Sequence, residues 1–112
     1  MSNRGLEVLR NPSKGPYATL TAAGTTQATA AEMTADVVMV TSASEDAGVM
    51  IPTLNARDEC IVCNGTNVTI LVYPRTGGQI NNSTANLPVI VSAFTAVRFR
   101  GIDGAGKVMA FV

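Results

Sequence analysis

The sequence predicts an all-β fold, on the basis of three observations. β-branched residues gather in short runs, as at residues 36–42 and 68–73. These runs recur at intervals of roughly 8–12 residues, and Gly, Pro and Asn residues separate them. Short strands at this spacing, with turn-forming residues between them, are typical of a β-sandwich or a β-barrel.

The clearest expected strands cover residues 36–42, 49–51, 60–63, 68–73, 89–91, 96–100 and 107–112. Asn64-Gly65 follows the third of these, and Asn-Gly is the strongest short signal for a β-hairpin. The glycine-rich residues 101–106 predict a second hairpin between the last two strands. Residues 26–35 mix helix-favouring Ala and Glu with Thr, and we expect a strand there as far as Ala30.

Residues 1–25 are predicted to form an extended N-terminal arm, and residues 26–112 a single β-sandwich domain. Two prolines and three glycines exclude a long helix or an unbroken central strand from the arm. The apolar pair Val8 and Leu9 is a candidate partner-binding element, because such a segment gains order in the groove of a neighbour. A flexible tail that binds no partner is the alternative interpretation.

Charge is sparse and balanced, with eight Lys plus Arg against eight Asp plus Glu, and the chain has no His. Nucleic-acid binding as the main role would call for a basic stripe, and none is visible. Without His, the commonest general base and metal ligand is missing, so we expect neither an enzyme nor a bound cofactor or metal. No run approaches the ~20 apolar residues that cross a bilayer, and the first residues lack a secretion signal. We therefore expect synthesis in the cytoplasm and no membrane partner.

The apolar pattern also favours self-association. Hydrophobic residues make up 46% of the chain, more than one small core is expected to hide. In the expected strand at residues 68–73, Leu71 and Tyr73 form one apolar face and the alternate β-branched residues form the other. A strand that is apolar on both faces needs a layer on each side, and another subunit supplies the second layer most simply. We therefore expect a closed homo-oligomer.

Cys60 and Cys63 form a lone Cys-x-x-Cys motif in a β-prone run. Side chains three positions apart on a strand point to opposite faces, so a disulfide between them would need a bulge. Zinc binding takes four ligands, and the chain offers no second Cys pair and no His. We expect ordinary buried thiols; redox chemistry and an intersubunit metal or disulfide are the alternatives.

Arg98 and Arg100 alternate with Val97 and Phe99 in an expected strand, so both guanidinium groups lie on one face. Such a pair fits acidic groups on a partner surface, and both arginines are candidate partner-binding residues. A merely solvated strand face is the alternative.

Several segments follow one another in a characteristic order. They read Gly-Thr-Thr-Gln-Ala-Thr-Ala (24–30), Val-Met-Val-Thr-Ser (38–42), Val-Thr-Ile-Leu-Val-Tyr-Pro (68–74), Gly-Gly-Gln-Ile-Asn (77–81) and Ala-Val-Arg-Phe (96–99). In this succession, residues 24–112 resemble small bacteriophage virion proteins of the head-decoration or cement type and related fibre modules. Residues 70–81 are the most specific part. The chain ends in Met-Ala-Phe-Val, where that group often has a Trp-containing strand.

The resemblance implies a β-sandwich, often jelly-roll-like, that assembles as an oligomer, commonly a trimer, and has no catalytic residues. The leading hypothesis is a decoration or cement protein on the virion's outer capsid surface. It would bind the major capsid protein and stabilise the shell, as any ligand specific for the assembled state does. A head-fibre or tail-associated module that contacts the host or another virion protein is one alternative. A carbohydrate-binding β-sandwich is another.

Overall fold

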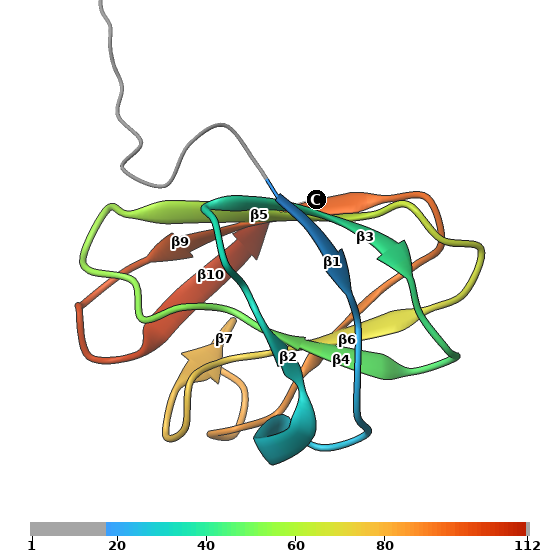
Figure 1. The fold of residues 1–112 in the computed structure, drawn as a ribbon. Helices are drawn as coiled ribbons and strands as arrows, with labels where there is room; N and C mark the ends of the chain where they lie inside the picture. The colour runs from blue at the N-terminus through green and yellow to red at the C-terminus, as the bar shows by residue number, and fades with distance from the viewer. Residues whose placement is uncertain (1–17, 112) are drawn as a thin grey trace, which may run out of the picture.

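A computed structural model describes residues 18–111, and the all-β prediction is confirmed (Figure 1). Val8 and Leu9 lie outside the described residues. The strands are β1 (Ala18–Thr21), β2 (Ala31–Glu32), β3 (Val37–Ser42), β4 (Ala47–Met50), β5 (Glu59–Asn64), β6 (Ile70–Tyr73), β7 (Gln79–Ile80), β8 (Val89–Val91), β9 (Ala96–Gly101) and β10 (Lys107–Phe111). A single 3-10 turn, η1 (Gln27–Thr29), provides the helical content of this part of the chain.

The strands form two sheets that face each other. One has six strands in the order β1-β3-β5-β9-β10-β7, and the other has four in the order β2-β4-β6-β8. In Figure 1, β3, β5, β9 and β10 form the upper layer, with β4 and β6 below them. From β1 to β9, each strand lies in the opposite sheet from the one before it.

This alternation makes many neighbouring strands parallel. The pairs β1–β3, β3–β5, β2–β4 and β4–β6 all run in the same direction, as do β7 and β10. Antiparallel pairing joins β5 to β9, β9 to β10, and β6 to β8. A jelly roll is built from antiparallel strands in Greek keys, so the connectivity here differs from that arrangement.

The core fills the space between the sheets. Alternate residues of the six-stranded sheet point into it, including Val38 and Val40 of β3 and Phe99 of β9. Ile70 and Val72 of β6 meet them from the four-stranded sheet. The side-chain period of two along a strand therefore sets which residues are buried, as the sequence pattern predicted.

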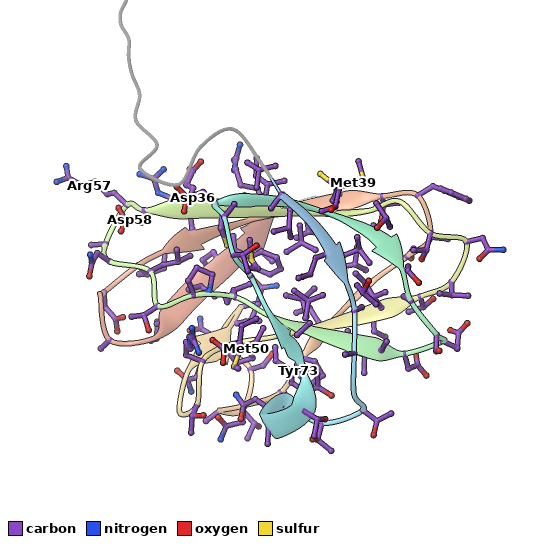
Figure 2. All side chains as sticks on the ribbon, viewed as in Figure 1. Asp36, Met39, Met50, Arg57, Asp58 and Tyr73 are labelled. Atoms are coloured by element: carbon purple, nitrogen blue, oxygen red, sulfur yellow. The ribbon has the colours of Figure 1, made fainter. Side chains whose placement is uncertain are left out.

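A second, smaller cluster covers part of the outer side of the four-stranded sheet. Met50 and Tyr73 pack there against Ala30, which follows η1 (Figure 2). The Tyr73 hydroxyl donates a hydrogen bond of 3.3 Å to the carbonyl oxygen of Thr25. Part of the second apolar face of β6 is thus covered by the same chain. The sequence pattern had led us to expect that another subunit would supply this cover.

Two local expectations differ from the structure near the N-terminal end. The strand expected as far as Ala30 is instead the η1 turn, in which the hydroxyls of Thr26 and Thr29 lie 2.8 Å apart. Residues 18–21, placed in the arm, form β1 and pair with β3. The sheet therefore begins before the expected boundary at residue 25, because one edge of β3 accepts this short segment.

The hairpin expected at Asn64-Gly65 is wrong. The four-residue connection at residues 64–67, which was expected to be its turn, joins two strands that are not paired with each other. The chain instead leaves the six-stranded sheet after β5 and enters the four-stranded sheet at β6. The hairpin expected across residues 101–106 is confirmed, since β9 and β10 pair antiparallel.

Asn64 makes the crossing between the sheets possible. Its side chain is 2% exposed, and its Nδ2 donates to the carbonyl oxygens of Val68 (2.8 Å), Val91 (3.2 Å) and Ser92 (3.1 Å). Its Oδ1 accepts hydrogen bonds from the Thr66 backbone N–H (3.0 Å) and hydroxyl (2.7 Å). One amide therefore satisfies backbone groups of the β5–β6 connection, of the end of β8 and of the loop that follows β8.

The turn between β9 and β10 is fixed by a carboxylate. Asp103 Oδ1 accepts hydrogen bonds from the backbone N–H groups of Ala105 (2.9 Å) and Lys107 (3.2 Å). These two bonds favour the ionised form, so the pKa of Asp103 lies below its ordinary value.

Replacing Asn64 with Ala should destabilise the protein by about 2–4 kcal/mol, because the buried Val91 carbonyl, the partly buried carbonyls of Val68 and Ser92, and the Thr66 backbone N–H each lose a hydrogen bond. Urea unfolding followed by circular dichroism measures this. Asn67→Ala is the matched control, since Asn67 is exposed in the same connection and should change the free energy of unfolding little. Equal stability of the two variants would contradict the role given to Asn64.

Candidate interaction surface

The outer face of the six-stranded sheet, the side away from the core, is the candidate functional surface. The strand register places its side chains in rows that cross the sheet. One row contains Thr19, Met39, Cys63 and Ala96; the next contains Val37, Ile61, Arg98 and Phe111; a third contains Glu59, Arg100 and Met109. Most of these positions are apolar.

Large apolar side chains on this face remain exposed. Met39 is 37% exposed, Phe111 is 41% exposed, and the neighbouring loop residue Phe94 is 71% exposed. In Figure 2, Met39 points away from the core above the upper layer. These apolar side chains lie together on one face and its border, which makes the face a candidate for contact with a partner. Leu87 and Ile90 are also exposed, but they lie outside the six-stranded sheet.

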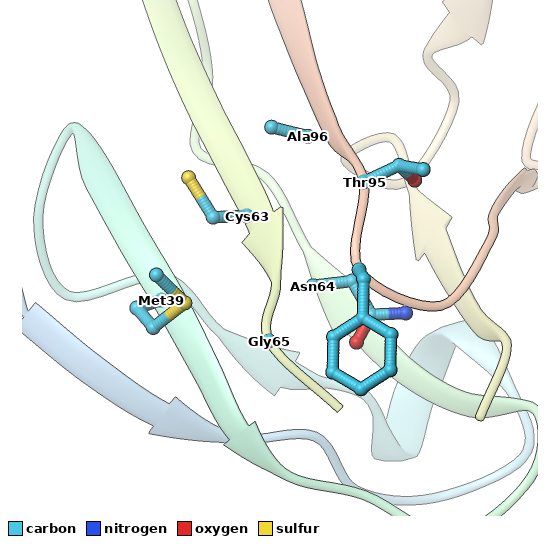
Figure 3. Close-up of a pocket in the computed structure, with 7 residues that line it drawn as sticks. Met39, Cys63, Asn64, Gly65, Thr95 and Ala96 are labelled. Atoms are coloured by element: carbon cyan, nitrogen blue, oxygen red, sulfur yellow. The ribbon is translucent and has the colours of Figure 1, made fainter. Parts of the chain in front are cut away.

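Two shallow hollows lie next to each other on this face. The first, of about 290 Å³, is lined by Met39, Cys63, Gly65, Phe94 and Ala96, together with the adjoining residues Asn64 and Thr95 (Figure 3). The second, of about 230 Å³, is lined by Ile61, Ala96, Val97, Arg98 and Phe111. Ala96 lines both hollows, so it lies at the boundary between them.

The two arginines singled out from the sequence lie on this face, as their alternation with Val97 and Phe99 predicted. Arg100 Nη1 is 2.7 Å from Glu59 Oε2, and Arg98 Nε is 3.9 Å from Glu59 Oε1. The Arg98 guanidinium also stacks over the Phe111 ring, 4.9 Å from its centroid. Glu59 therefore offsets much of the positive charge, and the face carries a mixed-charge border beside an apolar centre.

Phe94 was missed by sequence reasoning and is held in an unusual conformation. Its φ is +57°, in the left-handed region that bulky residues rarely occupy. Its backbone N–H donates to the Thr66 carbonyl (3.2 Å), and the adjoining Thr95 carbonyl accepts from the Asn64 N–H (2.8 Å). The same Asn64–Thr66 unit that guides the sheet crossing thus holds Phe94 outward. The sequence of this loop has no periodic pattern, so it could not predict that Phe94 projects outward.

The two cysteines point to opposite faces of β5, as expected. Cys60 is buried, whereas Cys63 is half-buried on the outer face. The expectation of two buried thiols is therefore wrong for Cys63, because the outer face of β5 lacks a second layer. Across residues 18–111, no group of three or more His, Cys, Asp or Glu side chains is placed to hold a metal ion.

The described residues contain no helix that is long and apolar enough to span a membrane. No protein-family model matches the chain, and neither a curated protein nor a solved structure matches it. The assignment of function therefore depends on the outer face and its neighbouring loops.

The difference between the two thiols is directly measurable. In nanomolar solutions of the folded chain, a fluorescent maleimide should label Cys63 at least about tenfold faster than Cys60, because only Cys63 is accessible to the reagent. The Cys63→Ser variant should show only the slow reaction until denaturant is added. Rapid labelling of that variant in the native state would contradict the burial of Cys60.

Proposed function

We propose that this chain is a non-catalytic assembly protein of a virus particle, a decoration or cement subunit on the capsid surface. The observation that carries the proposal is the exposed apolar outer face of the six-stranded sheet. A face of this kind on a rigid sheet is suited to burial against another protein, since buried apolar area supplies most of the free energy of association.

The segment that most resembles phage decoration proteins, residues 70–81, has a structural role here. It contains β6, the buried Tyr73 and the short strand β7 that completes the edge of the six-stranded sheet. Two facing sheets around one core also support placing the fold among β-sandwiches. The residues that carry the resemblance are thus residues that build the fold. In a family of assembly proteins without catalytic residues, a shared sequence pattern is expected at such positions.

Cementing is a linkage effect. A subunit that binds only the assembled shell lowers the free energy of that state by an amount that grows with the logarithm of its concentration relative to its Kd. In the proposal, the chain associates with itself and with the major capsid protein, and the N-terminal segment that contains Val8 and Leu9 contributes to the capsid contact. The charged border formed by Glu59, Arg98 and Arg100 would add orientation and specificity.

The carbohydrate-binding alternative has less support from this surface. Sugar sites combine an aromatic platform with several polar groups that fix the hydroxyls. The first hollow is lined largely by Met39, Cys63, Ala96 and Phe94, which offer few such groups. An enzymatic role also has less support, because the Glu59 carboxylate is occupied by Arg100 and the chain has no His.

Co-sedimentation with capsid shells tests the proposal. The full chain should pellet with shells of the virus that encodes it, after those shells have been stripped of the protein, and binding should saturate. Deletion of residues 1–16 should weaken pelleting by about tenfold or more, because the proposal assigns part of the capsid contact to this segment. The truncated chain should keep the thermal unfolding of the full chain. A full chain that stays in the supernatant would contradict the decoration role.

A further inference from the structure

We propose that two copies of this chain pack face to face through the outer face of the six-stranded sheet. In this arrangement, Phe94 of each copy occupies the hollow lined by Ile61, Ala96, Arg98 and Phe111 of the other. The inference rests on the proposed assembly function and specifies the self-contact within it. It is carried by the match between a projecting aromatic side chain and a hollow on the same surface.

The projecting group is Phe94. It is 71% exposed and has a φ of +57°. Its backbone N–H donates to the Thr66 carbonyl, and the carbonyl of the next residue, Thr95, accepts from the Asn64 N–H. Conformational strain of this kind persists only where the surroundings impose it, and it is concentrated at binding sites. A backbone that is fixed in advance reduces the entropy lost when the aromatic side chain binds, and aromatic anchors of this kind dominate many interfaces.

The receiving group is the second hollow. Its volume is about 230 Å³, whereas an apolar cavity of roughly 150 Å³ already accommodates benzene. Ile61 and Ala96 provide apolar walls, and one face of the Arg98 guanidinium stacks on Phe111. Its opposite face is then suited to a second aromatic ring through a cation–π contact.

The position of Ala96 makes this pair of features self-complementary. Ala96 lies between the hollow beside Phe94 and the hollow that would receive a second Phe94. A twofold axis through Ala96 exchanges the two sides, so the same aromatic contact forms twice. The small side chain of Ala96 permits close approach at the axis.

The charges on this face are compatible with a second copy. Glu59 lies within ion-pair distance of both Arg98 and Arg100, so the border of the face keeps only a small net charge. The whole chain is formally neutral, so two copies do not repel each other strongly. The contact is twofold and therefore departs from the threefold order that the family resemblance implies.

Disulfide trapping tests the predicted axis. In the register, Ala96 lies opposite Cys63, so the trap must be the double variant Cys63→Ser with Ala96→Cys to exclude an internal disulfide. Under mild oxidation, this variant should form a covalent dimer on a non-reducing gel.

Cys63→Ser with Met109→Cys is the matched control. Met109 lies on the same face, opposite Arg100, four residues along the strands from the row of Ala96. The axis of a face-to-face pair lies between the copies and, since the two hollows are displaced along the strands, runs across the strands. Met109 is then about 13 Å from the axis, so its two copies would be about 26 Å apart, too far for a disulfide. We expect cross-linking at Ala96 to exceed that at Met109 by about tenfold or more. Equal rates at the two positions would indicate random collision and overturn the inference.

A third substitution tests Phe94 itself. Phe94→Asn removes the ring, and Asn tolerates positive φ, so the fold should be kept. Added to the Ala96→Cys trap, it should reduce the cross-linking rate by about tenfold, while thermal unfolding stays that of the parent. Undiminished cross-linking would overturn the role of Phe94. If the full chain pellets with shells but the Ala96 trap forms no dimer, the self-contact is wrong and the decoration role stands. If the trap forms the dimer but the full chain does not pellet, the decoration role is wrong and the self-contact stands.

Discussion

The buried side-chain amide of Asn64 is the interaction on which the rest of the structure depends. It bonds the backbone of the connection that leaves the six-stranded sheet and of the loop that returns to it from β8. Because the chain changes sheets after almost every strand, its connections must cross the edge of the core, where backbone groups lose both water and ladder partners. Asn64 supplies those partners at one end of the sheets. The same hydrogen bonds fix the loop that carries Phe94, so folding and presentation of the candidate contact residue are coupled.

The outer face shows how a small chain divides its apolar residues. The side chains between the sheets form the core, and the η1 segment covers Met50 and Tyr73 on the four-stranded sheet. Within the described residues, no equivalent segment covers Met39, Ile61 and Phe111, which remain partly exposed. An antiparallel or mixed sheet tolerates one solvated face when that face is polar. Here it is mainly apolar, and its charged residues pair with each other at the border. This arrangement is the physical basis for assigning the chain an assembly role.

The sequence predicted what depends on side-chain periodicity and failed where single side chains decide the outcome. β3, β5, β9 and β10 lie close to their expected positions, because alternating apolar residues and glycine-rich turns determine them locally. The Asn64-Gly65 hairpin was wrong because the amide bonds distant carbonyls, which composition cannot reveal. β7 was missed because two residues are too short for a pattern. On the candidate surface, Arg98 and Arg100 were found by alternation, whereas their pairing with Glu59 and the projection of Phe94 depend on tertiary contacts between separate strands and loops.

The central claim is that two copies of this chain pack together through the outer face of the six-stranded sheet. Multi-angle light scattering of the purified full chain, across a micromolar concentration series, tests it most directly, because burial of this face requires association. The account predicts a mass that rises with concentration to that of two copies, or of another even number, as a twofold contact requires. A chain that remains a monomer throughout the series, or that forms a trimer alone, would contradict it.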